Sequence, residues 1–369
     1  MDLNTKKITI KVIGIGGAGG NMVNSLVDEN LENVELFVAN TDNQDLIKNR
    51  VENKIQLGND TAGLGTGGNP EIGAQCANES LEELDKIINN TDLLILVAGL
   101  GGGTGTGATP VIADYAKKHG ILTLAIVTTP MEELEGSRIC AVASHGLREI
   151  KDSVNSYMVI SNEKLMKQNI NLPLTASFQQ ANICVRDTIE LINSIANSTG
   201  FINIDFNDIK QVLSKGGKIT TTTGKCNGDQ QIQKAMDLVS NSNQFVDKPQ
   251  SFGSIILHFQ VGKSTSYGDL LTLKKEILNH YGIDETVDTQ MGIDNVMKND
   301  SRDEYFKFSI ILTESNDNKV NKLEQDTSIK TDSLDDEINE ITSGINLIGD
   351  NDINTTFENS NNTDPLPEF

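Results

Sequence analysis

The chain has 369 residues, and its 52 Asp and Glu outnumber its 30 Lys and Arg, which gives a formal net charge of −22. So acidic a protein is not expected to bind nucleic acid or to dock on an anionic membrane, because both interactions depend on Lys and Arg. Its four cysteines form no CxxC pair and no apolar run approaches a membrane span, so the composition favours a cytoplasmic protein without a metal site and without direct membrane insertion.

Strands and helices alternate along the first half of the chain. The β-branched run Ile8–Ile15 predicts a buried strand, as in a parallel sheet. Further strands are expected at 36–39, 93–98 and 121–127, and helices at 21–29 and 110–118. Strands that alternate with helices predict an α/β fold with right-handed crossovers and a doubly wound, Rossmann-like sheet.

The second half changes character. Apolar residues recur on one face of a long helix expected at 175–197. Shorter helices are expected at 208–213, 231–239 and 267–279, and strands at 218–223, 254–260 and 305–313. Residues 314–369 contain 14 acidic residues and three Lys, too polar a composition to fold. We therefore expect a nucleotide-binding domain (1–174), a core helix (175–199), a smaller α/β C-terminal domain (200–313) and a disordered acidic tail (314–369).

A glycine-rich loop follows the first predicted strand. Gly14–Asn21 contains the pattern GxGxxG, in which glycines let backbone amides approach a phosphate at a helix N-terminus. Asp42 ends the second strand, where a dinucleotide fold places the acid that binds the ribose. These residues alone fit a nicotinamide-dependent oxidoreductase as well as another nucleotide-binding protein.

A second glycine cluster separates these alternatives. Gly99–Gly107 holds six glycines and two threonines in nine residues, and such a run forms a nest for the oxygens of a di- or triphosphate. A third loop, Gly63–Pro70, could reach a terminal phosphate. The segment Val261–Ser264 resembles the end of a Walker A motif. It is not one, because Leu257 stands where that motif requires its first glycine. Three glycine loops without a P-loop predict a nucleoside triphosphate bound by backbone.

The second cluster also carries a specific family signature. Its segment Gly101–Gly107, GGGTGTG, resembles the G-box of the tubulin/FtsZ family. Similar to the family as well are the first glycine loop through Asn21, and the segments 40–42, 68–71, 135–136, 162–165 and 203–208. The resemblance covers about residues 7–313. It implies a tubulin/FtsZ-like fold and a bacterial cell-division GTPase, cytoplasmic and located at the division site beneath the membrane.

The resemblance further implies a GTP- or GDP-binding site, with Mg²⁺ coordinated mainly by phosphates and water rather than by the protein. The residues expected at the nucleotide are Gly16, Gly17, Ala18, Gly19, Gly20, Asn21, Asn40, Asp42, Gly67, Gly68, Gly101, Gly102, Gly103, Thr104, Gly105, Thr106, Gly107, Glu135, Arg138, Asn162, Phe178, Asn182 and Ile183.

The loop after the core helix carries Asn203, Asp205 and Asp208. In the family this loop completes the site of the next subunit, so the resemblance implies that these three residues are catalytic, with Asp205 and Asp208 orienting water and any Mg²⁺ at a neighbour's γ-phosphate. Such a head-to-tail contact does not close and gives filaments. Taken without the resemblance, the two acids are interpreted as solvated residues that cap the following helix.

Three positions depart from the family pattern. Ile183 stands where the family has the Asp that reads the guanine edge, which predicts weaker discrimination against other purines unless Asn182 or Asn162 covers part of that edge. Ile139 stands at the family's phosphate-side Arg, and Arg138 is the candidate replacement. Asp364–Phe369 resembles the family's adaptor peptide without its basic end, which implies membrane-tethering and division proteins as partners.

We therefore predict a GTP-dependent polymerising cytoskeletal protein that forms homopolymeric filaments and hydrolyses GTP between subunits. The alternative is a divergent homologue that co-assembles and regulates, with slow or no hydrolysis. Ile183 and Ile139 favour this alternative, whereas the intact Asp205 and Asp208 oppose it. An NAD-dependent Rossmann oxidoreductase is a distant alternative, because it leaves the second glycine cluster and the acidic loop unexplained.

Overall fold

The computed structural model describes residues 8–29, 31–58, 63–168, 170–171, 173–197, 201–227, 230–241, 246–262, 265–284, 287–295 and 305–315. All of them belong to one compact unit, Met1–Asn316. The predicted acidic tail beyond residue 315, with the adaptor peptide Asp364–Phe369, lies outside these described residues.

The described strands form one ten-stranded sheet in the order β3-β2-β1-β4-β5-β6-β7-β10-β8-β9. They are β1 (Ile10–Ile15), β2 (Val34–Asn40), β3 (Asn53–Gln56), β4 (Leu93–Gly99), β5 (Leu122–Thr129), β6 (Ser156–Ser161), β7 (Gly217–Asn227), β8 (Phe252–Val261), β9 (Asp288–Asn295) and β10 (Tyr305–Glu314). The first six strands are parallel, and their order is that of a doubly wound nucleotide-binding sheet. The predicted fold class is therefore confirmed.

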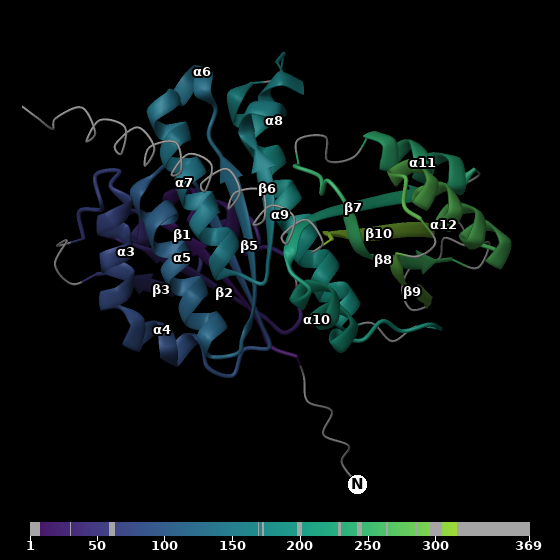
Figure 1. Cartoon of the computed structure of the whole chain (residues 1–369), viewed down its shortest axis with the longest axis horizontal. Coiled ribbons are helices and arrows are strands. Elements are labelled where there is room, and N and C mark those ends of the chain that lie inside the picture. Colours follow the sequence, from purple (N-terminus) through teal and green to yellow (C-terminus); the bar gives the residue numbers. More distant parts are fainter. Residues whose placement is uncertain are drawn as a thin grey trace, which may run out of the picture. The chain divides into compact units, whose positions relative to one another are not determined.

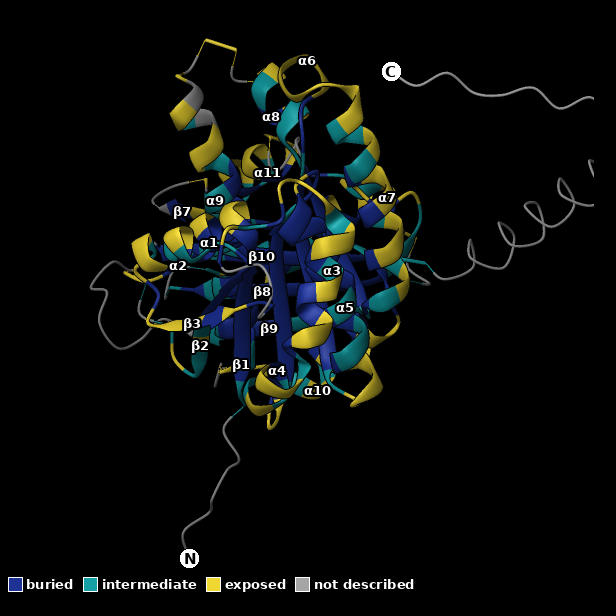
Figure 2. Ribbon diagram, turned by 90° about the vertical axis from the view of Figure 1, so that its left-hand side faces the viewer, coloured by how far each residue is buried: buried dark blue, intermediate teal, exposed yellow. Residues whose placement is uncertain are grey.

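Helices cover both faces of this sheet (Figures 1 and 2). They are α1 (Gly16–Asn24), α2 (Asn43–Lys48), α3 (Pro70–Glu79), α4 (Leu81–Ile88), α5 (Gly103–Lys118), α6 (Glu132–Glu135), α7 (Ser137–Ser153), α8 (Asn162–Gln168), α9 (Leu174–Ala196), α10 (Phe206–Ser214), α11 (Gln231–Asn241) and α12 (Tyr267–Tyr281). Side chains of β4 alternate between two cores: Leu93 joins the core with α1 and α9, and Leu94 joins the core with α3, α4, α5 and α7. A strand buried on both faces is a continuous apolar run, which is why β4 was predictable.

The long helix α9 connects the two halves of the sheet. It has 23 residues and is therefore ~35 Å long. Its buried residues Val185, Ile189 and Ile192 share a core with side chains of β4 in the first half, and with Ile256 and Ile311 in the second half. The predicted core helix is thus confirmed over Leu174–Ala196, and α9 is long enough to reach from one end of the parallel sheet to the other.

Two helices begin earlier than the sequence pattern predicted. α1 begins at Gly16 rather than at residue 21, and α5 begins at Gly103 rather than at residue 110. Glycine has low helix propensity, so a propensity argument places it outside the helix. Here the close packing around these glycines determines the helix start. The first turns of both helices are therefore part of the glycine loops.

Candidate functional site

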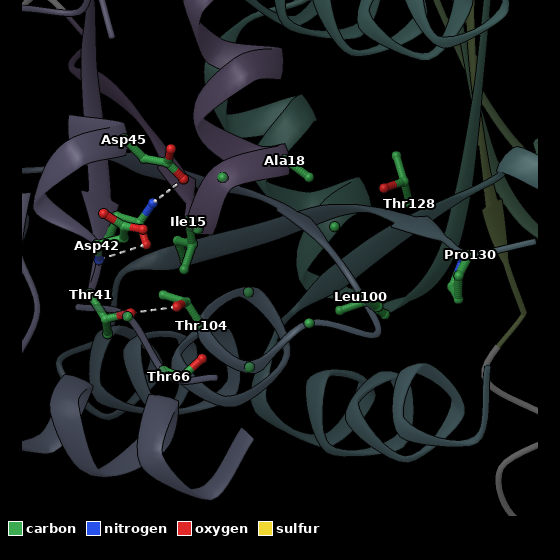
Figure 3. Close-up of a pocket in the computed structure, with 18 of the residues that line it drawn as sticks. Ile15, Ala18, Thr41, Asp42, Asp45, Thr66, Leu100, Thr104, Thr128 and Pro130 are labelled. Carbon is green, nitrogen blue, oxygen red and sulfur yellow. Dashed lines mark hydrogen bonds between the residues drawn. The ribbon is translucent and has the colours of Figure 1, made fainter. Parts of the chain in front are cut away.

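The carboxyl ends of β1, β2, β4 and β5 open into a cavity of about 680 Å³. In a doubly wound sheet a crevice forms at this edge, where the strand order reverses between β1 and β4. Ile15 ends β1, Asn40 ends β2, and Gly99 ends β4, and all three line the cavity. Figure 3 shows Asp42 and Asp45 on one side, Thr128 and Pro130 on the other, and Thr104 between them.

Two glycine loops meet in the cavity. A Cβ at Gly16, whose φ is +72°, would lie 3.0 Å from the backbone nitrogen of Gly105, so the starts of α1 and α5 are in contact. Neither helix has a side chain that caps its N-terminus. The first backbone N–H groups of a helix have no partner within the helix, so both helix starts are able to bind an anion.

A third loop lies beside them. Thr66 and Gly67 line the cavity, and the side-chain positions of Gly67 and Gly68 face open space, with no atom within 4 Å of an added Cβ. A Cβ at Gly103 would collide with Oγ1 of Thr66, so this hydroxyl lies against the start of α5. The loop thus adds further backbone and one hydroxyl to the part of the cavity where α1 and α5 begin.

Polar contacts fix the end of β2 in the cavity wall. The hydroxyls of Thr41 and Thr104 are 2.7 Å apart, and this buried contact joins the end of β2 to the second glycine cluster (Figure 3). Asp42 caps α2 by accepting a hydrogen bond from Gln44 N at 2.8 Å. Asn40 Nδ2 donates to Asp45 Oδ2 at 3.4 Å. The predicted Asn40 and Asp42 are therefore held in place by their own loop.

The other side of the cavity combines an aromatic ring with an unpaired acceptor. Phe178 on α9 is 39% exposed and Asn162 on α8 lies near it in the lining. The Oδ1 atom of Asn162 is buried and has no hydrogen-bond partner among the residues described. Buried acceptors are normally paired, so a ligand that brings a donor and a flat ring fits this side of the cavity.

A carboxylate from α6 also lines the cavity. It belongs to Glu135, whose Oε1 accepts a hydrogen bond from Met131 N at 3.0 Å. Burial, followed by the nearby carboxylates of Glu132, Glu135 and Glu163, raises the pKa of the Cys140 thiol. With Asp42 and Asp45, Glu135 makes the carboxylates of the lining three in number.

Ten of the residues expected at the nucleotide are not part of the lining of this cavity, although Gly20 and Asn21 line a smaller pocket that shares Gly16 and Gly17 with it. The expected residues that do not line the cavity are Gly19, Gly20, Asn21, Gly68, Gly101, Thr106, Gly107, Arg138, Asn182 and Ile183. Gly19 lets α1 pack on Val97 of β4, and Thr106 accepts a hydrogen bond from Gly101 N at 2.9 Å. Arg138 is exposed on α7.

Five lining residues lie outside the segments that the sequence assigned to the site, namely Asp45, Thr128, Pro130, Met131 and Leu134. Three of them, Thr128, Pro130 and Met131, lie at the carboxyl end of β5 or directly after it. The strand ends themselves were therefore a usable signal, because all of them meet at one edge of the sheet.

Asp205 and Asp208 lie far from this cavity. They form a capping box at the start of α10: Asp208 N donates to Asp205 Oδ1 at 3.0 Å, and Asp205 N donates to Asp208 Oδ2 at 2.8 Å. α10 lies at the opposite end of the molecule from α6 and α8 in both views (Figures 1 and 2). Because the part of α9 between Phe178 and its last residue, Ala196, is ~27 Å long, the two acids cannot reach the cavity of their own chain.

Among the residues that the structure describes, no group of three His, Cys, Asp or Glu side chains is arranged to hold a metal ion. Among the helices described, none combines the length and the apolar character that crossing a membrane would require.

Comparison with known proteins identifies what the chain resembles. Residues 9–169 match the family described as "Tubulin/FtsZ family, GTPase domain". The chain is 41% identical over 244 residues to the cell division protein FtsZ of Buchnera aphidicola subsp. Baizongia pistaciae, and 38% identical over 263 residues to that of Pseudomonas aeruginosa. These matches cover 66% and 70% of this chain, and 63% and 66% of the two relatives.

A solved structure shows the same fold over most of its length. It is an empty FtsZ dimer from M. jannaschii, with a TM-score of 0.70 and 32% sequence identity, and the match covers 84% of this chain and 89% of that chain. The chain spans somewhat less than two thirds of the length of the curated relatives that it matches.

Proposed function

The chain belongs to the tubulin/FtsZ family, and we propose that it is a cell-division protein that binds GTP at the carboxyl edge of its sheet and hydrolyses it within head-to-tail filaments. The observation that carries this proposal is the separation of the two halves of the site. The cavity lies at one end of α9 and the acids Asp205 and Asp208 follow its other end. A complete site then needs the cavity of one copy and the acidic loop of the next.

The cavity suits a guanine nucleotide on three counts. The uncapped starts of α1 and α5 offer amides to the phosphates, the open space beside Gly67 leaves room for a terminal phosphate, and Asn162 Oδ1 offers a buried acceptor to the base. Mg²⁺ would be held by phosphate oxygens and water, where it would neutralise phosphate charge. The protein's own contribution is the backbone nest.

The acids suit the role of water-orienting groups from a neighbour. Each carboxylate uses one oxygen in the capping box and keeps a second oxygen outside it. Phosphoryl transfer needs positioning and charge stabilisation rather than a covalent partner, so groups that arrive from outside complete the site. Each contact joins two different surfaces, and such a heterologous contact repeats as a filament. The dimer known for the M. jannaschii relative supports self-association.

The test is GTP turnover and light scattering measured together over a protein concentration series. Turnover per subunit should be low when the protein is dilute and rise with assembly. Turnover that is independent of concentration would contradict the shared site. Assembly without turnover would favour the alternative of a co-assembling regulator.

Variants of Asp205 separate chemistry from folding. Asp205→Ser keeps a side-chain cap for α10 but removes the carboxylate, so assembly should persist while turnover falls by roughly a hundredfold. Asp205→Ala removes both and should also destabilise α10 by about 1 kcal/mol. If Asp205→Ser retains wild-type turnover, this carboxylate has no part in hydrolysis.

We propose reduced guanine selectivity as a finer property of the site. Ile183 and Asn182 do not line the cavity, so Asn162 is the candidate group at the base edge. Guanine offers N1–H and amino donors to an acceptor such as Oδ1, and a single hydrogen bond discriminates only modestly. Competition of ATP against labelled GTP tests this, and discrimination as strong as in a relative with Asp at this position would refute it.

The remaining proposals concern the division of the chain and its tail. We propose two domains, 1–174 and 200–313, on either side of the core helix 175–199, with 314–369 as an acidic tether. Membrane-tethering and division proteins would bind Asp364–Phe369 and hold filaments at the division site beneath the membrane. Deletion of residues 314–369 should spare assembly and abolish localisation in cells, and loss of assembly would count against the tether.

A further inference from the structure

A buried polar pair joins the last two strands of the sheet. His258 on β8 is 1% exposed, and its Nε2 lies 2.9 Å from Oδ2 of Asp294 on β9. A carboxylate only accepts hydrogen bonds, so Nε2 donates in this pair. In the parallel ladder Asp294 lies opposite Gln260 rather than His258, so the bond runs diagonally between the strands. The bond therefore opposes sliding of β9 along β8, in addition to holding the two strands side by side.

The pair is poorly suited to stabilise the fold. Oδ1 of Asp294 is buried and has no hydrogen-bond partner within the described ranges, and the same holds for Oε1 of Gln290 on the same face of β9. Buried unpaired acceptors are costly, and buried ionic pairs are often replaceable by apolar side chains without loss of stability. What such a pair provides is a defined geometry.

Strand β9 in turn holds the segment that leads to the catalytic acids. Phe201 N and Ile202 N donate to the carbonyl oxygen of Ile293 at 2.8 and 3.2 Å. Ile293 N donates to the carbonyl oxygen of Ile202 at 2.8 Å. Ile293 directly precedes Asp294 in the sequence. The backbone of the acidic loop is thus fastened to β9 immediately beside the buried pair.

Side-chain packing links the pair to the loop a second time. A Cβ at Gly292 would lie 2.9 Å from Cγ1 of Ile204 and 3.1 Å from Cδ2 of His258. The imidazole and Ile204 therefore lie close to the same side of Gly292. Ile204 is the residue directly before Asp205, so a shift of β9 or of the imidazole is transmitted to the start of the capping box.

The far end of α10 is also tied to β9. Lys215 follows α10, and its Nζ lies 2.6 Å from Oδ2 of Asp288 at the start of β9. Both ends of α10 therefore follow the position of β9. β9 is the last strand in the sheet order, and its neighbour there is β8. The β8–β9 ladder and the His258–Asp294 pair are thus one of the connections that position the helix and its acids, beside the core that α10 shares with α9.

We propose that His258 and Asp294 are positioning residues for GTP hydrolysis. They hold β9 on β8, and through Ile293 and Ile204 they set the position at which Asp205 and Asp208 meet the neighbouring subunit. This inference rests on the function proposed above. It predicts an effect on turnover within filaments and none on nucleotide binding, because the cavity lies at the other end of α9.

The test compares Asp294→Leu with Asp294→Asn in the full chain. Leu removes the hydrogen bond and suits a buried site, whereas Asn keeps an acceptor for His258. Asp294→Leu should lower kcat per assembled subunit on the order of tenfold, with the GTP Kd unchanged and the urea unfolding midpoint lowered, because the buried N–H of His258 loses its partner. Asp294→Asn should restore kcat to within about twofold of wild type. Thr223→Val, which removes a hydroxyl contact with Ser309 between β7 and β10, is the matched control and should change nothing.

The outcomes are distinct. Wild-type kcat in Asp294→Leu overturns the inference, as does a fall that matches a loss of folded protein measured by GTP-binding stoichiometry. If this variant does not fold, His258→Phe/Asp294→Leu replaces both partners by apolar groups and should fold with the same lowered kcat. Failure of the wild type to show assembly-dependent turnover would overturn the proposed function itself, and is recognised before any variant is made.

Discussion

Two glycines of the second cluster, Gly102 and Gly107, should respond in opposite ways to substitution by Ala. A Cβ at Gly107 would collide with the carbonyl oxygen of Pro70 and lie 2.8 Å from Ala74 N, both of which belong to the backbone of α3. A Cβ at Gly102 meets no atom within 4 Å, and Gly102 has φ −85°, which any residue adopts. Gly102 lines the cavity and Gly107 does not.

The magnitudes follow from these surroundings. Gly107→Ala gains about 1 kcal/mol of helix propensity but forces α5 and α3 apart, and overpacking typically costs about 1–3 kcal/mol or more when backbone must move. A net loss of about 2 kcal/mol of unfolding free energy is expected. Gly102→Ala should change the free energy of unfolding by less than about 1 kcal/mol. Ala is a somewhat poorer N-cap for α5 than Gly, but it also reduces the conformational freedom of the unfolded chain, and the two effects oppose each other. It should weaken GTP binding roughly 10- to 100-fold, the equivalent of one charge-assisted hydrogen bond.

Urea unfolding and binding of fluorescent GTP measure the two effects separately. Affinity should be compared per folded molecule, since an unstable variant also loses binding sites. The reasoning fails if Gly102→Ala unfolds the protein while Gly107→Ala selectively loses nucleotide. It also fails if both variants lose affinity equally at unchanged stability, because packing around Gly107 would then have no energetic role.

Three further predictions concern stability and reactivity. Thr41→Val and Thr104→Val each leave the other buried hydroxyl unpaired and should lower the free energy of unfolding by about 1–3 kcal/mol. The double variant should lose less than the sum of the two, and simple additivity in a double-mutant cycle would contradict the contact. Burial, then Glu29 and Asp187, raise the pKa of Glu190, so the folded state holds this proton more tightly and loses stability as pH rises above the ordinary value of 4.5. Glu190→Gln should therefore be more stable than wild type at pH 7 and lose this advantage in acid, and an equal gain at both pH values would exclude the titration. Burial raises the pKa of the Cys184 thiol far above its ordinary range, so a thiol reagent should label the half-buried Cys140 first, and native-state labelling of Cys184 detected by mass spectrometry would refute its burial.

The sequence predicted the strands that are buried on both faces and missed those at the edges. β1 and β4 are continuous apolar runs, so their burial is visible in the chain itself. β3 (NKIQ) and β9 (DTQMGIDN) lie at the two ends of the sheet order, and both are largely polar. Their extended conformation is imposed by hydrogen bonds to the neighbouring strand rather than by their own hydrophobic pattern. Which strand will be the neighbour cannot be predicted from a short stretch of sequence.

The glycine loops show a similar limit for the site. The sequence identifies Gly101–Gly107 as a nucleotide-binding signature, and six residues between Gly99 and Gly105 line the cavity. It does not show which glycines face the ligand and which allow α5 to pack on α3, because both uses require the absence of a Cβ. Only the approach of Pro70 to Gly107 distinguishes them. In the same way, Thr41 and Thr66 enter the cavity because of where their loops end.

The way in which the two halves of the sheet are joined determines how a movement of the acidic loop would reach the cavity. β6 and β7 pair over only two positions, Ser156 with Gly217 and Tyr157 with Lys218, whereas β7 and β10 pair over nine. The first half of the sheet and the half that holds the acids are therefore weakly joined by strands. Their shared core on α9 is the larger connection, since side chains of β4, β8 and β10 all pack with this helix. A contact that moves the acidic loop at a filament interface therefore acts directly on β9 through the backbone hydrogen bonds of Ile202, and it reaches the first half of the sheet mainly through α9. At its other end α9 carries Phe178 into the cavity.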